Sequence, residues 1–230
     1  MSFIDKDTLY LFCDASILNL KGSEIYIGCP GVISAEIQQD RLELNYIKSK
    51  LLFDTTNNNS EITAILLGVY EAIKNKDKYK KIKLLSDSMI CISSLRLWIF
   101  SWINNIRNGI LYSSSNQPVA NQDIIIHIIQ LITNNNLNIE LYHQKGHVTS
   151  TKRSLDEAKN VFYKSNGILL DDEEVKIISY YNNSIDGYTK QQLVENYSNP
   201  FIRTNLINPF NYNIEDCDFK SYIKLIERKM

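Results

Sequence analysis

The first part of the chain alternates apolar runs with short polar turns, which predicts β-strands. Residues 8–14 are an apolar run that ends on an acid, as expected of a buried strand that places a side chain at its tip. Residues 25–37 and 42–53 predict two more strands, separated by polar turns at 21–24 and 38–40. Because these connections are short, the three strands are expected to form an antiparallel meander.

The pattern then changes to a helical period. After a polar loop at residues 55–60, apolar side chains recur at intervals of three and four residues, which predicts an amphipathic helix with Glu61 in its first turn. The apolar face of this helix consists of Ile62, Ile65, Leu66, Val69 and Ile73.

Strands and helices alternate through the next part of the chain. Residues 82–85 and 139–142 predict buried strands, helices are expected over 89–106 and 123–133, and a further helix has Asp156 in its first turn. This order predicts an α/β (mixed α+β) fold. We expect a five-stranded mixed sheet, in which three antiparallel strands are followed by parallel ones, flanked by helices.

The character of the chain changes after residue 166. We predict one domain over residues 1–166 and a helical C-terminal extension over 167–230. Within the extension, helices are expected at 171–181 and 190–197, and a well-formed amphipathic helix at 216–229.

Composition and charge restrict the class of protein. Hydrophobic residues make up 44% and charged residues 22% of 230 residues, as in soluble globular proteins. The net charge of −1 provides no overall positive field, so nucleic acid would have to be bound by a local basic patch or through metal ions. The longest apolar runs are too short to cross a bilayer, and no membrane association is expected.

The four cysteines are far apart and lack the spacing of metal ligands, so free thiols and an intracellular, cytoplasmic location are expected, with no disulfides. The bias towards Asn, Ile, Tyr and Lys is compatible with a viral, phage or low-GC bacterial source. For a viral or phage protein, the location would be the host cytoplasm.

Four acids occupy the ends or starts of the predicted elements. Asp14 and Asp87 end strands that are expected to be neighbours, while Glu61 and Asp156 begin helices that pack on the sheet. Each acid alone also fits a helix cap or a turn. Gathered together, however, four carboxylates repel one another at neutral pH unless divalent cations neutralise them. Hard oxygen ligands suit Mg²⁺, for which Mn²⁺ could substitute, and two such ions can promote phosphodiester hydrolysis.

Several motifs around these acids resemble those of one family. They are C-D-A-S at 13–16, T-T-N-N-N-S-E at 55–61, S-D-S at 86–88, P-V-A-N-Q-D at 118–123, and K-G-H at 145–147 with Asp156 nine residues later. Over roughly residues 8–165 the chain resembles a type 1 ribonuclease H. The resemblance implies the RNase H-like fold and two bound Mg²⁺ ions. It also implies an endoribonuclease that cleaves the RNA strand of RNA–DNA hybrids and leaves 5′-phosphate ends, for primer or hybrid removal in DNA replication.

The resemblance also implies roles for individual residues. Asp14, Glu61 and Asp87 would be the central metal ligands, with Asp14 bridging both ions. Asp156 would hold the ion on the side of the nucleophile. His147, on a flexible loop, would assist proton transfer or product release.

Substrate contacts follow from the same motifs. The residues expected to contact the hybrid are Thr56, Asn57, Asn58, Ser16 and Ser88. Many family members carry a basic protrusion after the second helix, but here residues 104–121 contain one basic residue, Arg107. Lys220, Lys224 and Arg228 on the last helix could supply phosphate contacts instead, or form a solvated rim.

Two other functions remain open from the sequence. One is a different metal-dependent nuclease on the same fold, such as a junction resolvase. The other is a catalytically silent scaffold that binds hybrids and acts through the C-terminal extension, whose protein partner the sequence does not identify.

Overall fold

The computed structural model describes residues 2–39, 41–197 and 214–227. Its centre is a mixed sheet with the strand order β3-β2-β1-β5-β8, in which β1 pairs antiparallel with β2 and parallel with β5. The strands are β1 (Thr8–Asn19), β2 (Tyr26–Gln38), β3 (Arg41–Ser49), β5 (Lys81–Ser86) and β8 (Ile139–His143). The short β4 (Leu52–Phe53) also pairs with β2. The predicted five-stranded mixed sheet is therefore confirmed.

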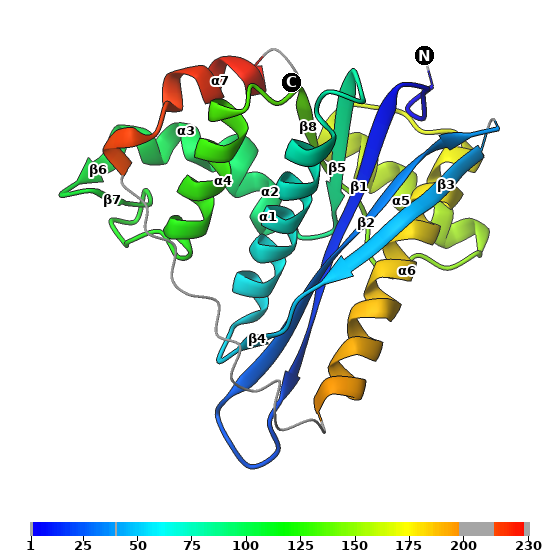
Figure 1. Ribbon diagram of the computed structural model, residues 1–230, viewed down its shortest axis with the longest axis horizontal. Helices are drawn as coiled ribbons and strands as arrows, with labels where there is room; N and C mark the ends of the chain where they lie inside the picture. Colours follow the sequence, from blue (N-terminus) through cyan, green and yellow to red (C-terminus); the bar gives the residue numbers. More distant parts are fainter. Residues whose placement is uncertain (1, 40, 198–213, 228–230) are drawn as a thin grey trace.

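Helices cover both faces of the sheet (Figure 1). One face carries α1 (Asn57–Asn75), α4 (Gln122–Asn134) and, beyond α4, α7 (Phe219–Glu227). The other face carries α5 (Lys152–Asn166) and α6 (Asp172–Tyr197). The helix expected over 89–106 is divided into α2 (Met89–Ser93), a π-helical turn (Ser94–Trp98), α3 (Ile99–Trp102) and a 3₁₀ turn (Ile103–Asn105). A small hairpin, β6 (Ile106–Arg107) and β7 (Ile110–Leu111), follows.

Alternation along β1 divides the interior into two cores. Leu9, Leu11 and Cys13 pack with α1 and α4, while Tyr10 and Phe12 pack with α5 and α6. All five side chains are fully buried, so β1 contributes to the core on both faces of the sheet. By the two-residue period of a strand, Asp14 and Ser16 belong to the α6 face.

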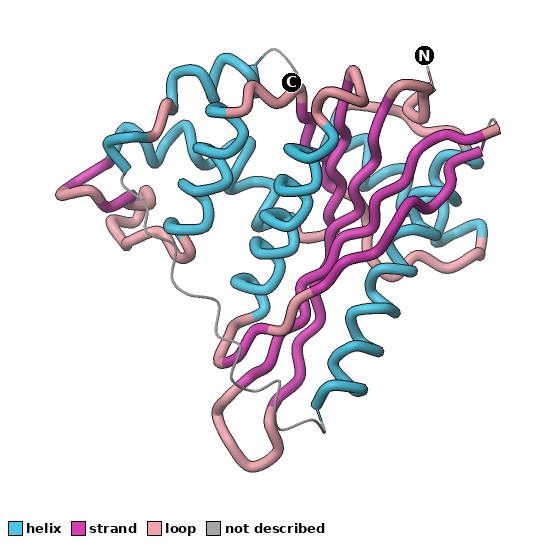
Figure 2. Tube along the Cα trace, viewed as in Figure 1, coloured by secondary structure: helices cyan, strands magenta, loops and turns pink. Residues whose placement is uncertain are grey.

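The sequence suggested that the first strand ends at Asp14, but β1 does not end there. It continues to Asn19 as one arm of a long hairpin with β2, which extends beyond the rest of the sheet (Figure 2). The pairing of β1 with β5, in contrast, stops at Cys13 and Ser86. Because β5 stops while β1 continues, Asp14 has no partner on β5, and Asp87 follows directly after the last residue of that strand.

Two helices begin earlier than predicted, and a threonine starts each one. Thr56 accepts a hydrogen bond from the backbone of Asn59 at the start of α1, and Thr151 accepts one from Ser154 at the start of α5. Glu61 and Asp156 are therefore in the second turn of their helices, and the expectation that they lie in the first turn is wrong. They are not capping residues, since the threonines already satisfy the end of each helix.

The predicted extension shares a core with the sheet. The two helices expected at 171–181 and 190–197 are one continuous helix of 26 residues, α6. Its buried side chains Val175, Ile178, Tyr181 and Ile185 pack against β1 and β2. The predicted boundary at residue 166 coincides with the end of α5, where Gly167 adopts a positive φ of 72°.

All four cysteines are free; Cys13, Cys29 and Cys91 are buried, and Cys217 is partly buried. Among the residues that the structure describes, no helix combines the length and the apolar character needed to cross a bilayer.

Candidate active site

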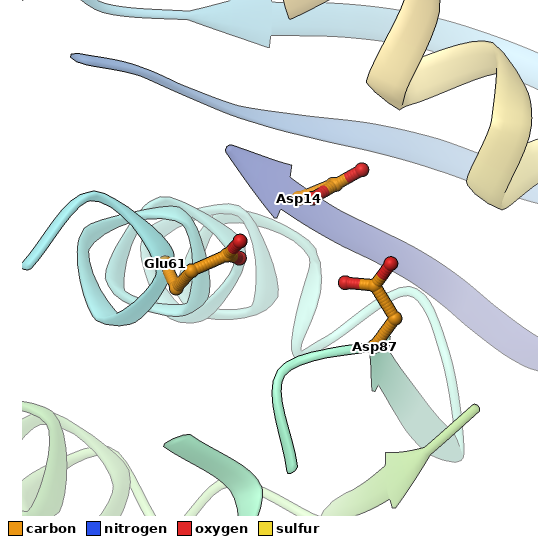
Figure 3. Close-up of side chains that lie close together, drawn as sticks. All are labelled: Asp14, Glu61 and Asp87. Carbon is orange, nitrogen blue, oxygen red and sulfur yellow. The ribbon is translucent and has the colours of Figure 1, made fainter. Parts of the chain in front are cut away.

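Three carboxylates meet where β1 and β5 separate (Figure 3). Asp14 lies on β1, Glu61 on α1, and Asp87 directly after β5. One ligand oxygen from each lies within 4.8 Å of the others. The backbone amide of Ala15 donates to Asp14 at 2.7 Å. Elements from three parts of the chain therefore position one acidic cluster, which we call the acidic triad.

The acidic triad resists ionisation. Burial and the neighbouring Asp87 raise the pKa of Asp14 to about 8. Burial, with the charges of Asp14 and Asp87, raises the pKa of Glu61 to about 9. Burial also raises the pKa of Asp87, opposed by a hydrogen bond donated by Asn182 and by the nearby His147. Such a cluster is stable at neutral pH with protons or with cations in it.

The donor set fits a hard divalent cation. All three groups are carboxylates, the ligands that Mg²⁺ and Mn²⁺ prefer. Oxygen Oε2 of Glu61 is buried without a hydrogen-bond partner, which is costly unless a ligand completes it. The residues present are therefore suited to the ions that the sequence motifs imply.

The loop after β8 packs tightly against the acidic triad. A Cβ atom added at Gly146 would lie 2.2 Å from Oδ2 of Asp87, so only glycine allows this approach. The next residue, His147, has a positive φ of 51°, and its side chain is 75% exposed. Its Nδ1 lies 3.6 Å from Oδ2 of Asp186. The imidazole thus lies near the acids and is free to reach solvent.

Asp156 is not brought to the acidic triad. It lies on the exposed side of α5, and its charge acts on Lys159 together with Asp171 and Asp172. Among the described residues, the carboxylate group that could hold a metal ion contains Asp14, Glu61 and Asp87 alone. Asp186 is outside this group as well, and the role predicted for Asp156 stays a prediction.

The expected substrate-contact residues divide into two groups. Asn57 and Asn58 are exposed at the start of α1, one turn from Glu61, where they could meet a ligand. Three hydroxyls are already bonded within the protein: Thr56 caps α1, Ser88 caps α2, and Ser16 is buried against Thr189 at 2.8 Å. The two asparagines are therefore the more available contacts.

A side-chain hydrogen bond joins two of the sequence motifs. Asn59 donates to the side chain of Asn121 at 3.0 Å, which links the start of α1 to the segment before α4. Asn121 has a positive φ of 55°, a conformation that asparagine tolerates. This contact supports the surface on which Asn57 and Asn58 are displayed.

The predicted basic contacts lie on a peripheral helix. Helix α7 buries Tyr222 and Ile226, and the Tyr222 hydroxyl donates to the backbone oxygen of Leu95 at 2.9 Å. Lys220 and Lys224 are exposed, and Arg228 lies outside the described residues. Their contact with nucleic acid stays a prediction.

Sequence reasoning missed the contribution of α6 to this region. Asn182 donates to Oδ2 of Asp87 at 3.4 Å, Asp186 lies beside His147, and Thr189 contacts Ser16. Residues 182–189 were expected to connect two helices, because asparagine, serine and glycine disfavour helix interiors. The signal that could have found α6 was the recurrence of apolar positions at 178, 181 and 185.

Comparisons with known proteins agree with this geometry. The RNase H family model matches residues 6–160. Ribonuclease HI of Haemophilus influenzae is 31% identical over 137 residues, covering 60% of this chain and 77% of that protein. Ribonuclease H of Schizosaccharomyces pombe is 34% identical over 96 residues, covering 42% of this chain and 32% of that protein.

A solved structure shares the fold. A mutant of the prototype foamy virus protease-reverse transcriptase superposes with a TM-score of 0.51 at 16% identity, over 68% of this chain and 20% of that one. The sequence match over more than half of the chain, together with the shared fold, leads to one conclusion. The chain belongs to the RNase H family.

Proposed function

We propose that this protein is an endoribonuclease that hydrolyses the RNA strand of RNA–DNA hybrids with two divalent ions. The observation that carries the proposal is the acidic triad, three carboxylates within 4.8 Å of one another at the point where two strands separate. Family membership supports ribonuclease activity on hybrids. Bound Mg²⁺ would supply an activated water and charge neutralisation at the scissile phosphate.

The protein's own groups would divide the remaining tasks. Asp14, Glu61 and Asp87 would hold the ions. Asn57 and Asn58 would contact the hybrid, whose 2′-hydroxyl groups allow RNA to be distinguished from DNA. His147 would exchange a proton with the product, since its side chain is exposed beside the cluster.

The same proposal extends to the products and the biological setting. Cleavage would leave 5′-phosphate and 3′-hydroxyl ends, and the task would be removal of RNA primers or hybrids during replication. Free cysteines favour a reducing compartment, which supports an intracellular location.

The direct test is cleavage of labelled nucleic acids in Mg²⁺ by the wild type. We expect cleavage of an RNA–DNA hybrid, in its RNA strand alone, and no cleavage of duplex DNA, duplex RNA or a four-way junction. An Asp87→Asn variant serves as the control for contaminating nuclease and should leave the hybrid intact.

Two other outcomes of this experiment would favour a different function. Cleavage of the junction but not of the hybrid would favour a resolvase on this fold. Hybrid binding without cleavage in either Mg²⁺ or Mn²⁺ would favour a silent scaffold.

Gly146→Ala should impair catalysis without unfolding the protein. The added Cβ would displace either the loop or the carboxylate of Asp87, because it would lie only 2.2 Å from Oδ2 of Asp87. A displacement of about 1 Å can lower the rate about 100-fold, so kcat for hybrid cleavage should fall about 10- to 100-fold. The control is Gly187→Ala, where nothing lies within 4 Å of the added atom. Equal activity of the two variants would contradict the prediction.

A further inference from the structure

The position of α6 along β1 is determined by two contacts. Phe12 stacks on Tyr181 with ring centroids 4.9 Å apart, and Ser16 bonds to Thr189 at 2.8 Å. Four residues of strand span about 13 Å and eight residues of helix about 12 Å, so the two segments are matched in length. Their midpoints are Asp14 on β1 and Ile185, the residue before Asp186, on α6.

Close packing where the two midpoints meet supports this alignment of α6 along β1. Gly31 pairs with Asp14 across the β1–β2 ladder. A Cβ atom at Gly31 would lie 2.8 Å from Cδ1 of Ile185 and 2.7 Å from Cγ2 of Thr189. Glycine at this position thus allows α6 to lie directly on the strands beside Asp14. In Figure 3, α6 is the pale gold helix that passes beside β1.

Asp186 is on the side of α6 that faces the acidic triad. It follows Asn182 by one helical turn, and residues four apart share a helix face. Asn182 donates to Asp87 at 3.4 Å, so this face of α6 points to the cluster. The carboxylate of Asp186 is only 17% exposed and lies 3.6 Å from Nδ1 of His147.

The charge of Asp186 acts on all three members of the acidic triad. Its negative charge is among the main causes that raise the pKa of Asp14, of Glu61 and of Asp87, which places Asp186 close to all three. Lys190 bonds to Asp186 at 2.6 Å and also opposes the rise in the pKa of Asp14. The ammonium group of Lys190 therefore partly balances the charges of Asp186 and Asp14.

We propose that Asp186, on α6, is the fourth carboxylate of the metal site, in the role that the sequence motifs assign to Asp156. Residue 186 lies beyond the segment that the family model matches, which ends at residue 160. The C-terminal extension thus completes the active site. The ligand is a divalent cation. Metal binding by Asp186 can be measured without nucleic acid, so only the measurement of hybrid cleavage rests on the proposed function.

The test is isothermal titration of Mn²⁺ and Mg²⁺ into the full-length wild type and single variants, without nucleic acid. Asp186→Asn should weaken the affinity at least about tenfold or remove one of two binding events. Asp156→Asn should remain within about twofold of the wild type. Glu195→Gln, which neutralises an exposed acid further along α6, controls for the charge of the helix. Thermal denaturation confirms that each variant is folded.

Lys190→Gln distinguishes a metal-facing carboxylate from one that only pairs with lysine. If Asp186 faces the ion, removing the competing ammonium should preserve or strengthen metal binding. Weakening as large as that of Asp186→Asn would overturn the proposal, because the ion pair would then be what matters.

Other results of the titrations also test the role of Asp186. A loss with Asp156→Asn but not with Asp186→Asn, or no metal binding by the wild type, would overturn the proposal. Hybrid cleavage is measured in parallel, and Asp186→Asn should lower kcat at least about 100-fold. If the wild type binds metal but cleaves no hybrid, the proposed function fails while the titrations still decide the role of Asp186.

Discussion

Asp14→Asn is expected to abolish hybrid cleavage and, at pH 8 without metal, to make the folded protein more stable. The rate should fall at least about a thousandfold, because electrostatic stabilisation at the reacting phosphate depends on the ions this group would hold. The gain in stability follows from the pKa of Asp14, which burial and Asp87 raise to about 8.

Proton binding determines the sign of this stability change. An unfolded aspartate has a pKa of about 3.9. Between about pH 4 and pH 8 the folded state holds a proton that the unfolded state has lost, so stability falls as the pH rises through this window. Asparagine is never charged, so the variant lacks this loss. At pH 8 its free energy of unfolding should exceed that of the wild type by about 1–3 kcal/mol.

Urea denaturation at pH 4 and pH 8, in EDTA and in 10 mM Mg²⁺, checks this prediction. At pH 4 the difference should disappear, because Asp14 is then largely protonated in the folded protein. Saturating Mg²⁺ should stabilise the wild type by about 2–4 kcal/mol and the variant by less. A variant that is less stable than the wild type at pH 8 in EDTA would contradict the prediction.

Tyr181→Ala should cost about 3–5 kcal/mol in the free energy of unfolding. Tyr181 is 6% exposed, stacks on Phe12 of β1, and donates its hydroxyl hydrogen bond to the backbone oxygen of Leu42 at 2.8 Å. The substitution would leave a cavity between α6 and the sheet and remove this hydrogen bond to Leu42. Urea denaturation of the full chain measures the effect.

The neighbouring residue provides the matched control. Tyr180 is 66% exposed, so Tyr180→Ala should cost less than about 1 kcal/mol. Equal and small losses for the two variants would mean that α6 does not belong to the core. A large loss for Tyr181→Ala would show that α6 covers the sheet as part of its core.

Much of this protein can be predicted from local sequence patterns. Two-residue alternation and helical periodicity identify the sheet and its first helix, because burial on one face imposes these periods on the sequence. Neighbouring parallel strands also explain why Asp14 and Asp87 meet. The motifs at 55–61 and 145–147 indicate the family, since they combine short-range spacing with particular chemistry.

The tertiary structure decided what local patterns could not. Asn182, Ser184 and Gly187 disfavour a helix on their own, yet α6 continues through them because its apolar side chains are buried against β1 and β2. Along the chain, the K-G-H motif favours Asp156, and no local pattern indicates Asp186. Which of them lies near Asp14 depends on where α5 and α6 pack on the sheet. The position of α6 is determined by contacts between residues more than 160 positions apart, such as Phe12 with Tyr181 and Ser16 with Thr189.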